Sequence, residues 1–158
     1  MTENGSSRLY YKSPIGWLEL TGIIEGIQTV RFVERRRKDS KDTPVCLELC
    51  RKQLDEYFQG TGTTFAVPLS VSGTPFQKAV WRRLLEIPYG EIMTYGAVAK
   101  AIGRPHAARA VGQASNVNPV PILVPCHRVV GARGYLVGYG SGLWRKEWLL
   151  EHEGLSVQ

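Results

Sequence analysis

The sequence predicts an α+β protein made of two parts, residues 1–72 and 73–158. In the first part, short apolar runs alternate with Gly and Pro breaks and are followed by apolar residues at helical spacing, which is typical of a small antiparallel sheet and a helix. The second part contains several segments that begin with helix-capping residues, so it is predicted to be mainly helical. With 43% hydrophobic residues, the 158-residue chain has enough apolar side chains for a buried core, and this composition excludes intrinsic disorder.

Three short runs are predicted to form the strands of the sheet: 9–12, 17–20 and 27–33. Pro and Gly separate the first two runs and a Glu-Gly pair precedes the third, so both connections are predicted to be tight turns. The basic run 35–38 is typical of an exposed loop, and contact with nucleic acid is the alternative. Thr43 is predicted to cap a helix that starts at Pro44 and ends at Gly60.

The second part begins with a Thr-Pro-Phe-Gln run at 74–77, which has the spacing of a capping box with proline at the first helical position. Thr94 is predicted to cap a helix over 95–102, which Gly103 ends, and another short helix follows over 106–114. Two short helices joined by a tight turn that contains glycine are typical of a helix-turn-helix.

The second of these helices has a surface of very small residues: Ala107, Ala108, Ala110, Gly112 and Ala114. Such a surface allows the helix backbone to approach another body closely, and close packing against a neighbouring helix is the alternative interpretation. Arg109 lies among these small residues and favours a nucleic-acid groove.

The basic charge of the chain lies in its second part. Residues 73–158 hold 10 Lys and Arg against 5 Asp and Glu, whereas residues 1–72 hold 10 against 9. This imbalance favours a surface for a polyanion, although a modest excess of basic residues also aids solubility. No apolar run approaches the roughly 20 residues that a bilayer requires, and the start of the chain shows no secretory signal. We therefore expect no membrane contact and a cytoplasmic location, or a nuclear one in a host with a nucleus.

The three cysteines, an odd number, are too few for a disulfide framework, and none of their spacings matches a pair of zinc ligands. Cys46 and Cys50 lie one helical turn apart and are interpreted as packing residues. Cys126 differs, because it stands between Pro125 and two side chains that can carry positive charge. Such neighbours favour the thiolate, which is the reactive form of cysteine. In an extended strand His127 would face away from Cys126, so contact requires a bend or a bridging water.

The Pro-Cys-His-Arg-Val run resembles the active-site signature of the O6-alkylguanine-DNA alkyltransferases. Five segments carry the resemblance: 107–112, 118–122, 125–129, 138–139 and 146–154. It is specific over residues 74–154, whereas the first part matches only in its layout of a small sheet and a helix. The resemblance implies an RNase H-like α/β roll, followed by a winged-helix-like domain that contains the helix-turn-helix.

The resemblance also implies a function in DNA repair. Members of the family bind duplex DNA through the minor groove, rotate the alkylated guanine out of the stack and transfer its alkyl group irreversibly to one cysteine, so each molecule reacts once. O4-alkylthymine is a further candidate substrate. No cofactor or metal is implied, and the protein is expected to act as a monomer, with cooperative binding along DNA left open.

The resemblance assigns roles to residues as follows. The catalytic set is Cys126 as nucleophile, His127 as base acting through a water, Glu153 as its orienting partner, Tyr95 as donor to the leaving base and Asn118 as a brace. The DNA-binding set is Arg109 as the finger that fills the vacated space, with Ala107, Ala108, Ala110, Gly112, Gln113 and Arg128. The substrate pocket is formed by Tyr95, Val129, Tyr139, Gly140 and Ser141.

Three other functions are compatible with parts of this pattern. A lesion-recognition module without catalysis would lack the cysteine, which is present here as Cys126. A helix-turn-helix regulator would need side chains that read base edges, and the small surface of residues 107–114 is poor in them. A cysteine hydrolase would use the adjacent His127 as an awkwardly placed base.

Overall fold

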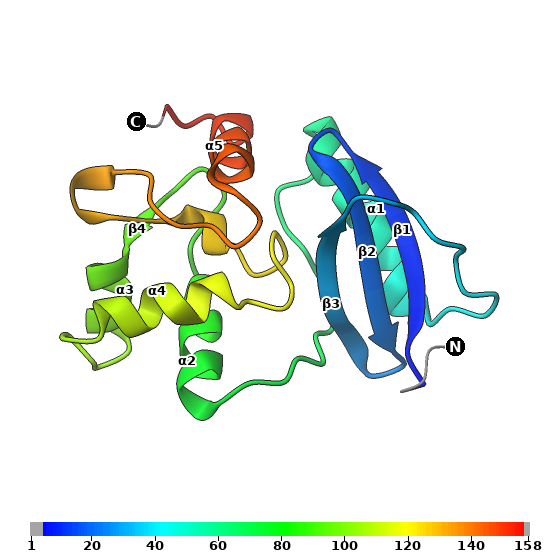
Figure 1. The fold of residues 1–158 in the computed structure, drawn as a ribbon, viewed down its shortest axis with the longest axis horizontal. Helices are drawn as coiled ribbons and strands as arrows, with labels where there is room; N and C mark the ends of the chain where they lie inside the picture. The colour runs from blue at the N-terminus through cyan, green and yellow to red at the C-terminus, as the bar shows by residue number, and fades with distance from the viewer. Residues whose placement is uncertain (1–4, 157–158) are drawn as a thin grey trace. The chain divides into compact units, whose positions relative to one another are not determined.

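The computed structural model describes residues 5–156 and confirms the α+β class. The chain divides into two compact units, the first ending at Ser72 and the second starting at Gly73. Figure 1 shows the long strands gathered in the first unit and most of the helices in the second. Within the described residues, no helix has the length and apolar character needed to cross a bilayer.

The first unit is a three-stranded antiparallel sheet covered by one helix. Its strands are adjacent in chain order: β1 (Ser7–Ser13), β2 (Gly16–Ile23) and β3 (Gly26–Val33). Leu20 of β2 pairs with Leu9 on one side and Val30 on the other, and all three are buried. Because side chains alternate between the two faces of a strand, this register places one apolar face under helix α1 (Figure 1).

Helix α1 (Val45–Gln59) begins one residue later than predicted. Pro44, not Thr43, is its N-cap, and no side chain caps the first turn; the Thr43 hydroxyl donates to Glu48 instead. At the other end Gly60 has a φ of 81°, the left-handed conformation that glycine adopts at low cost, so the predicted stop is confirmed. The helix buries Leu47, Cys50, Leu54 and Tyr57 against the sheet.

The second unit consists of short helices and two very short strands. In chain order the elements are α2 (Pro75–Leu84), β4 (Met93–Thr94), α3 (Tyr95–Ala101), α4 (Ala108–Asn116), the 3₁₀ helix η1 (Cys126–Arg128), β5 (Val129–Val130), the 3₁₀ helix η2 (Ala132–Gly134) and α5 (Leu143–His152). The capping box of Thr74 and Gln77 is present, and the Thr94 hydroxyl accepts from the Ala97 amide, so both predicted caps are confirmed. Helices α3 and α4 pack against each other as the predicted helix pair.

The parallel pairing of β4 with β5 was not predicted. Met93 pairs with Val129 and Thr94 with Val130. Tyr95 directly follows β4, and the Cys-His-Arg turn directly precedes β5. This short β-ladder therefore brings Tyr95 and the Cys-His-Arg turn together, although they lie about thirty positions apart in the sequence.

Candidate active site

Cys126 lies at a bend rather than in an extended strand. Pro125 has φ −79° and ψ 64°, and the Cys126 amide donates to the Val124 carbonyl over 2.8 Å, which defines an inverse γ-turn. The 3₁₀ helix η1 follows at once, with the Arg128 amide donating to the Pro125 carbonyl. Because of this bend, the Cys126 and His127 side chains are not forced to opposite faces.

Asn118 holds the loop that leads to this bend. Its Nδ2 donates to the Val124 carbonyl over 2.8 Å, and its Oδ1 accepts from the Val120 amide over 3.0 Å. Between these anchors Ile122, a buried β-branched residue, has a φ of 75°. Such a conformation costs about 1–3 kcal/mol and persists only where the surroundings impose it. Asn118 therefore has the geometry of a brace for the cysteine loop.

The electrostatic setting of Cys126 differs from the expectation that its thiolate is favoured. The residue is 5% exposed, and burial raises the pKa of its thiol. A hydrogen bond from Asn118 and the positive charge of Lys146 lower that pKa, but they do not outweigh burial. Cys126 is therefore protonated at neutral pH and needs a base to become a nucleophile.

A fully buried ion cluster includes His127, the residue that directly follows Cys126. His127 Nε2 and Glu153 Oε2 are 2.6 Å apart, and both side chains are 0% exposed. The Gly90 amide also donates to Glu153. Burial alone would raise the pKa of Glu153, but its hydrogen bonds with His127, Arg128 and Gly90 hold it well below the usual range. Burial lowers the pKa of His127, so the imidazole is neutral at pH 7.

Arg128 was predicted to contact DNA, and this prediction is wrong. Its side chain is buried: Nε and Nη2 donate to the two oxygens of Glu153 over 2.8 and 3.1 Å, and Nη1 donates to the Ile87 carbonyl over 2.7 Å. An unpaired carboxylate in this interior would be costly, and the guanidinium fork supplies the required counter-charge. Arg128 thus orients the partner of His127.

A second cluster surrounds Tyr95. Its hydroxyl donates to the Val137 carbonyl over 3.0 Å and accepts from Lys146 Nζ over 3.2 Å. Burial and the nearby Cys126 raise the pKa of Tyr95 to about 12. The Tyr139 hydroxyl is also buried and has no hydrogen-bond partner among residues 5–156. Burial raises the pKa of Tyr139, and the nearby Cys126 raises it further. Because Cys126 raises the pKa of Tyr95 and of Tyr139, both tyrosines lie near the thiol.

The remaining predicted pocket residues have different environments. Val129 is fully buried in β5, and the Ser141 carbonyl accepts from Arg145. A Cβ on Gly140 would lie 2.7 Å from the Asn116 carbonyl, so only glycine fits there. The absence of a side chain at position 140 is therefore a packing requirement where this loop meets the end of α4.

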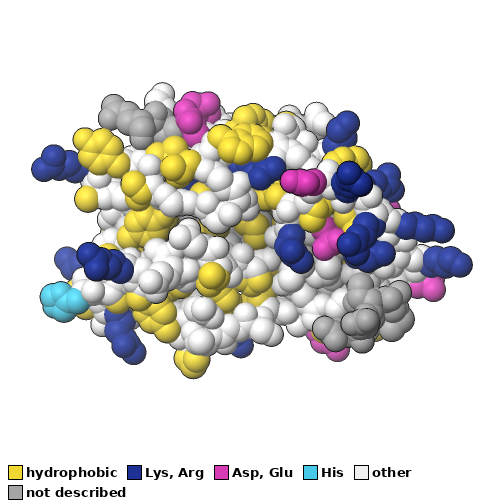
Figure 2. All heavy atoms as spheres, viewed as in Figure 1, with side chains coloured by type: hydrophobic (Ala, Val, Ile, Leu, Met, Phe, Trp, Pro, Cys, Tyr) yellow, Lys and Arg dark blue, Asp and Glu magenta, His cyan; other side chains and the backbone are white. Residues whose placement is uncertain are grey.

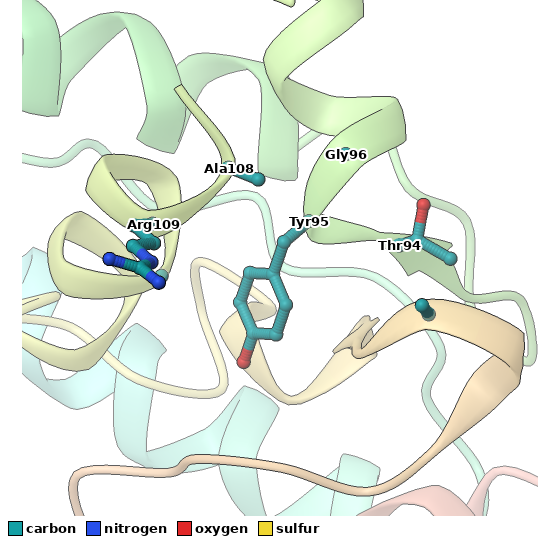
Figure 3. Close-up of a pocket in the computed structure, with 7 residues that line it drawn as sticks. Thr94, Tyr95, Gly96, Ala108 and Arg109 are labelled. Carbon is teal, nitrogen blue, oxygen red and sulfur yellow. The ribbon is translucent and has the colours of Figure 1, made fainter. Parts of the chain in front are cut away.

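An open pocket of about 440 Å³ lies beside Tyr95, between α3 and α4. Thr94, Tyr95, Gly96, Ala108, Arg109, Gly112 and Ala132 line it. Figure 3 shows Tyr95 and Arg109 projecting from neighbouring helices at this pocket. Arg109 and Gln113 are exposed, and Ala107, Ala108, Ala110 and Gly112 are half-buried, so most of the predicted small surface is accessible, with one cation. Ala114 was predicted to belong to this surface, and this is wrong, because it is buried and its carbonyl accepts from the Trp81 indole. Cys126 does not line this pocket, and of the five predicted pocket residues only Tyr95 does.

The segment of the second unit that contains the helix pair and Cys126 has no acidic residue. Between Glu91 and Glu147 the sequence holds seven Lys and Arg and no Asp or Glu. Figure 2 shows basic and hydrophobic side chains, and no acidic ones, over α3 and α4 on the face in view. Two of the seven, Arg128 and Lys146, are buried, so the other five give the surface its positive charge. Such a surface attracts the phosphates of a polyanion. In the described part of the chain, no His, Cys, Asp and Glu side chains gather into a metal-binding group.

Lys146 is a buried charged residue of this site to which the sequence assigned no role. It is 0% exposed and donates into the Tyr95 cluster. Lys146, Leu149, Leu150 and Glu153 are spaced at i, i+3, i+4 and i+7, and all four are buried. Charged residues at both ends of an otherwise apolar helical stripe were the signal that could have identified it.

Two family profiles match the chain. The 6-O-methylguanine DNA methyltransferase ribonuclease-like domain matches residues 8–71, and the DNA-binding domain of the same family matches residues 75–155. Together they cover nearly all of the described chain, and the change from one to the other falls at the division between the two units.

Individual proteins match over almost their whole length. A methylated-DNA–protein-cysteine methyltransferase of Methanosarcina acetivorans is 50% identical over 149 residues, which is 91% of this chain and 96% of the relative. One of Mycobacterium tuberculosis is 48% identical over 145 residues, covering 89% and 88%. The crystal structure of the M. tuberculosis O6-methylguanine methyltransferase superposes with a TM-score of 0.84 at 45% identity, covering 94% of this chain and 92% of that one. Its complex with DNA gives 0.84 at 46% identity, with coverage of 93% and 92%.

Proposed function

The chain belongs to the 6-O-methylguanine DNA methyltransferase family, and we propose that Cys126 is the residue that accepts the alkyl group. The protein repairs DNA by moving an alkyl group from alkylated DNA to one of its own cysteines. Among the three cysteines, only Cys126 lies beside a histidine–carboxylate pair. That juxtaposition carries the assignment, because the other two thiols lie on α1 in the first unit.

Activation of the thiol begins at His127. Glu153 is ionised and accepts a hydrogen bond, so the imidazole proton lies on Nε2 and the lone pair on Nδ1. His127 Nδ1 is buried and has no hydrogen-bond partner among the described residues, which leaves it available as a base. A water between the thiol and Nδ1 would carry the proton, and Glu153 would stabilise the imidazolium that forms.

The thiolate then attacks the alkyl carbon in a single displacement. The S–C bond forms as the C–O6 bond breaks, and the electron pair remains on the guanine. Tyr95 is the donor positioned to neutralise this developing charge, because its hydroxyl lies beside the pocket and near the thiol. The product is a thioether, which no second thiol of this unit can remove, so each molecule reacts once.

The DNA is expected to bind along α4. Chemistry on a stacked base requires its extrusion, at a cost of a few kcal/mol. The small residues of α4 permit close approach to the minor groove, and the exposed Arg109 can fill the space that the base leaves. All proposed site residues come from positions 95–153 of one chain, so a monomer suffices. We expect the protein in the compartment that holds the genome.

The test is transfer of a radiolabelled methyl group from O6-methylguanine in duplex DNA. We expect the label to appear on intact protein and to saturate at one group per molecule, even with DNA in excess. Peptide mapping should place the added methyl on Cys126 and leave Cys46 and Cys50 unmodified. Label on either of those residues, or continued turnover, would refute the assignment.

Replacing Arg109 with alanine should slow repair of duplex DNA about 10- to 100-fold, because the extruded state loses the side chain that replaces the base. Reaction with the free base O6-methylguanine, which needs no extrusion, should change less than about twofold. Arg104→Ala is the matched control, since it removes the same charge from the exposed turn before α4. Equal losses with both substrates would exclude the finger role.

A further inference from the structure

The turn between α2 and β4, residues 87–90, contacts the buried ion cluster, which consists of His127, Arg128 and Glu153. The Ile87 carbonyl accepts from Arg128 Nη1 over 2.7 Å, and the Gly90 amide donates to Glu153 Oε1 over 3.0 Å. Between these two contacts, the ring of Tyr89 lies over the Arg128 guanidinium, with 5.8 Å from the ring centroid to Cζ. Ile87 and Gly90 contribute backbone atoms to the cluster, whereas Tyr89 contributes its side chain.

Tyr89 covers the member of the cluster that lies closest to the solvent. The side chains of His127 and Glu153 are 0% exposed, and that of Arg128 is 7% exposed. Tyr89 itself is half-buried, so its ring lies at the boundary between the guanidinium and the solvent. Its hydroxyl donates to the His152 carbonyl over 3.3 Å, which holds the ring against the end of α5. A guanidinium within about 6 Å of an aromatic centroid attracts the ring, and the attraction is stronger when water is excluded.

Exclusion of water determines how basic His127 is. Three charged groups face its imidazole: Glu153 at the end of α5, Arg128 in η1 and Lys146 in α5. Burial lowers the pKa of His127, and the hydrogen bond and charge of Glu153 oppose this shift, whereas Arg128 and Lys146 add to it. Because burial is the largest of these effects, water that entered the cluster would return the pKa toward the ordinary value of about 6.5.

We propose that Tyr89 is a positioning residue for alkyl transfer, whose ring keeps water out of the ion cluster and so keeps His127 neutral and able to accept the thiol proton. This proposal rests on the proposed function, in which His127 is the base. Tyr89 does not line the pocket beside Tyr95, and it acts on His127 through Arg128 and Glu153. It therefore sets the lowest pH at which the protein repairs DNA at its full rate.

Three variants separate the ring from its hydroxyl and from the turn in general. Tyr89→Ala removes the ring from the guanidinium, whereas Tyr89→Phe keeps the ring and removes only the hydrogen bond to the His152 carbonyl. Leu85→Ala is the matched control, because it shortens a 49% exposed apolar side chain just before the same turn.

The first measurement is an NMR titration of the His127 imidazole in the free protein between pH 5.5 and 8, with the exposed His106 as internal reference. In Tyr89→Ala, the pKa of His127 should rise toward about 6.5, because burial no longer lowers it fully. Tyr89→Phe and Leu85→Ala should titrate as the wild type does. An unchanged pKa in Tyr89→Ala, or an equal rise in Tyr89→Phe, would overturn the proposal.

The second measurement is the second-order rate of methyl transfer from O6-methylguanine in duplex DNA over the same pH range. At pH 5.5 about nine-tenths of an imidazole with a pKa of about 6.5 is protonated, so Tyr89→Ala should retain about a tenth of its own plateau rate. The wild type should retain a larger share, because the pKa of its His127 is lower. Urea denaturation at pH 5.5 establishes that the variants are folded there. A loss by the same factor at every pH would mean a merely structural role and would contradict the proposal.

The two measurements separate this proposal from the proposed function. The titration needs no DNA, so it tests the cover over the cluster whether or not the protein transfers a methyl group. A pKa that rises while the rate profile stays unchanged would exclude His127 as the base and would overturn the proposal with it. A wild-type protein that accepts no methyl from DNA would refute the proposed function. If Tyr89→Ala fails to fold, Tyr89→Leu carries the comparison, because it keeps apolar volume but leaves the guanidinium without an aromatic ring over it.

Discussion

Replacing Cys126 with alanine is expected to abolish methyl transfer from DNA completely, leaving the label on protein at the level of a protein-free control. The imidazole of His127 then has no thiol to deprotonate, and no other nucleophile lies in the buried cluster that it shares with Glu153. The variant should still bind duplex DNA, because the small surface of α4 and Arg109 are unchanged. Gel-shift binding and label transfer measured on the same preparation separate the two properties.

The matched control for this variant is Cys46→Ala. It also removes a buried thiol, but from α1 of the first unit, where the sulfur donates to the Ile23 carbonyl. It should retain full transfer at one group per molecule. Residual transfer to the Cys126 variant, or loss of transfer from the Cys46 variant, would contradict the assignment of the acceptor.

Local structure was the most predictable part of the molecule. The Thr74–Gln77 capping box, the Thr94 cap and the Gly60 stop depend on hydrogen bonds and dihedral angles within a few residues, which sequence spacing reports directly. Thr43 failed as a cap because its hydroxyl bonds to a glutamate side chain rather than to the helix amides.

Features that depend on long-range packing were not predictable. The pairing of β4 with β5 joins distant segments through two residues each, which leaves no periodic pattern in the sequence. Arg128 looks like a DNA contact beside a reactive cysteine, and only its burial against Glu153 shows that it serves the interior. The direction of the Cys126 pKa shift likewise depends on burial, which its charged sequence neighbours do not indicate.

The raised pKa of Cys126 changes the chemistry expected of the site. A thiolate stabilised in advance would need no base, whereas a buried, protonated Cys126 requires one, which is the role that we propose for His127 oriented by Glu153. In the proposed mechanism, the nucleophile is therefore unreactive until His127 accepts its proton.

Glu153→Ala should lower the free energy of unfolding by about 3–5 kcal/mol, the usual cost of removing one partner of a buried ion pair. Its carboxylate accepts hydrogen bonds from His127, Arg128 and the Gly90 amide, and the change leaves the Arg128 charge buried without its counter-charge. Urea denaturation measures the loss. Glu151→Ala, an exposed carboxylate on the same helix, should shift stability by less than about 0.5 kcal/mol.

The acid dependence of Glu153→Gln gives the independent check, because this variant keeps the shape of the side chain and removes its charge. In the folded wild type the pKa of Glu153 is depressed, whereas an unfolded glutamate titrates near 4.3. Its contribution is therefore complete above about pH 5 and is lost as the pH falls toward the folded pKa. The wild type should lose stability steeply below pH 5, and the variant should start lower and fall less steeply there. Parallel curves would show that the carboxylate does not hold this cluster together.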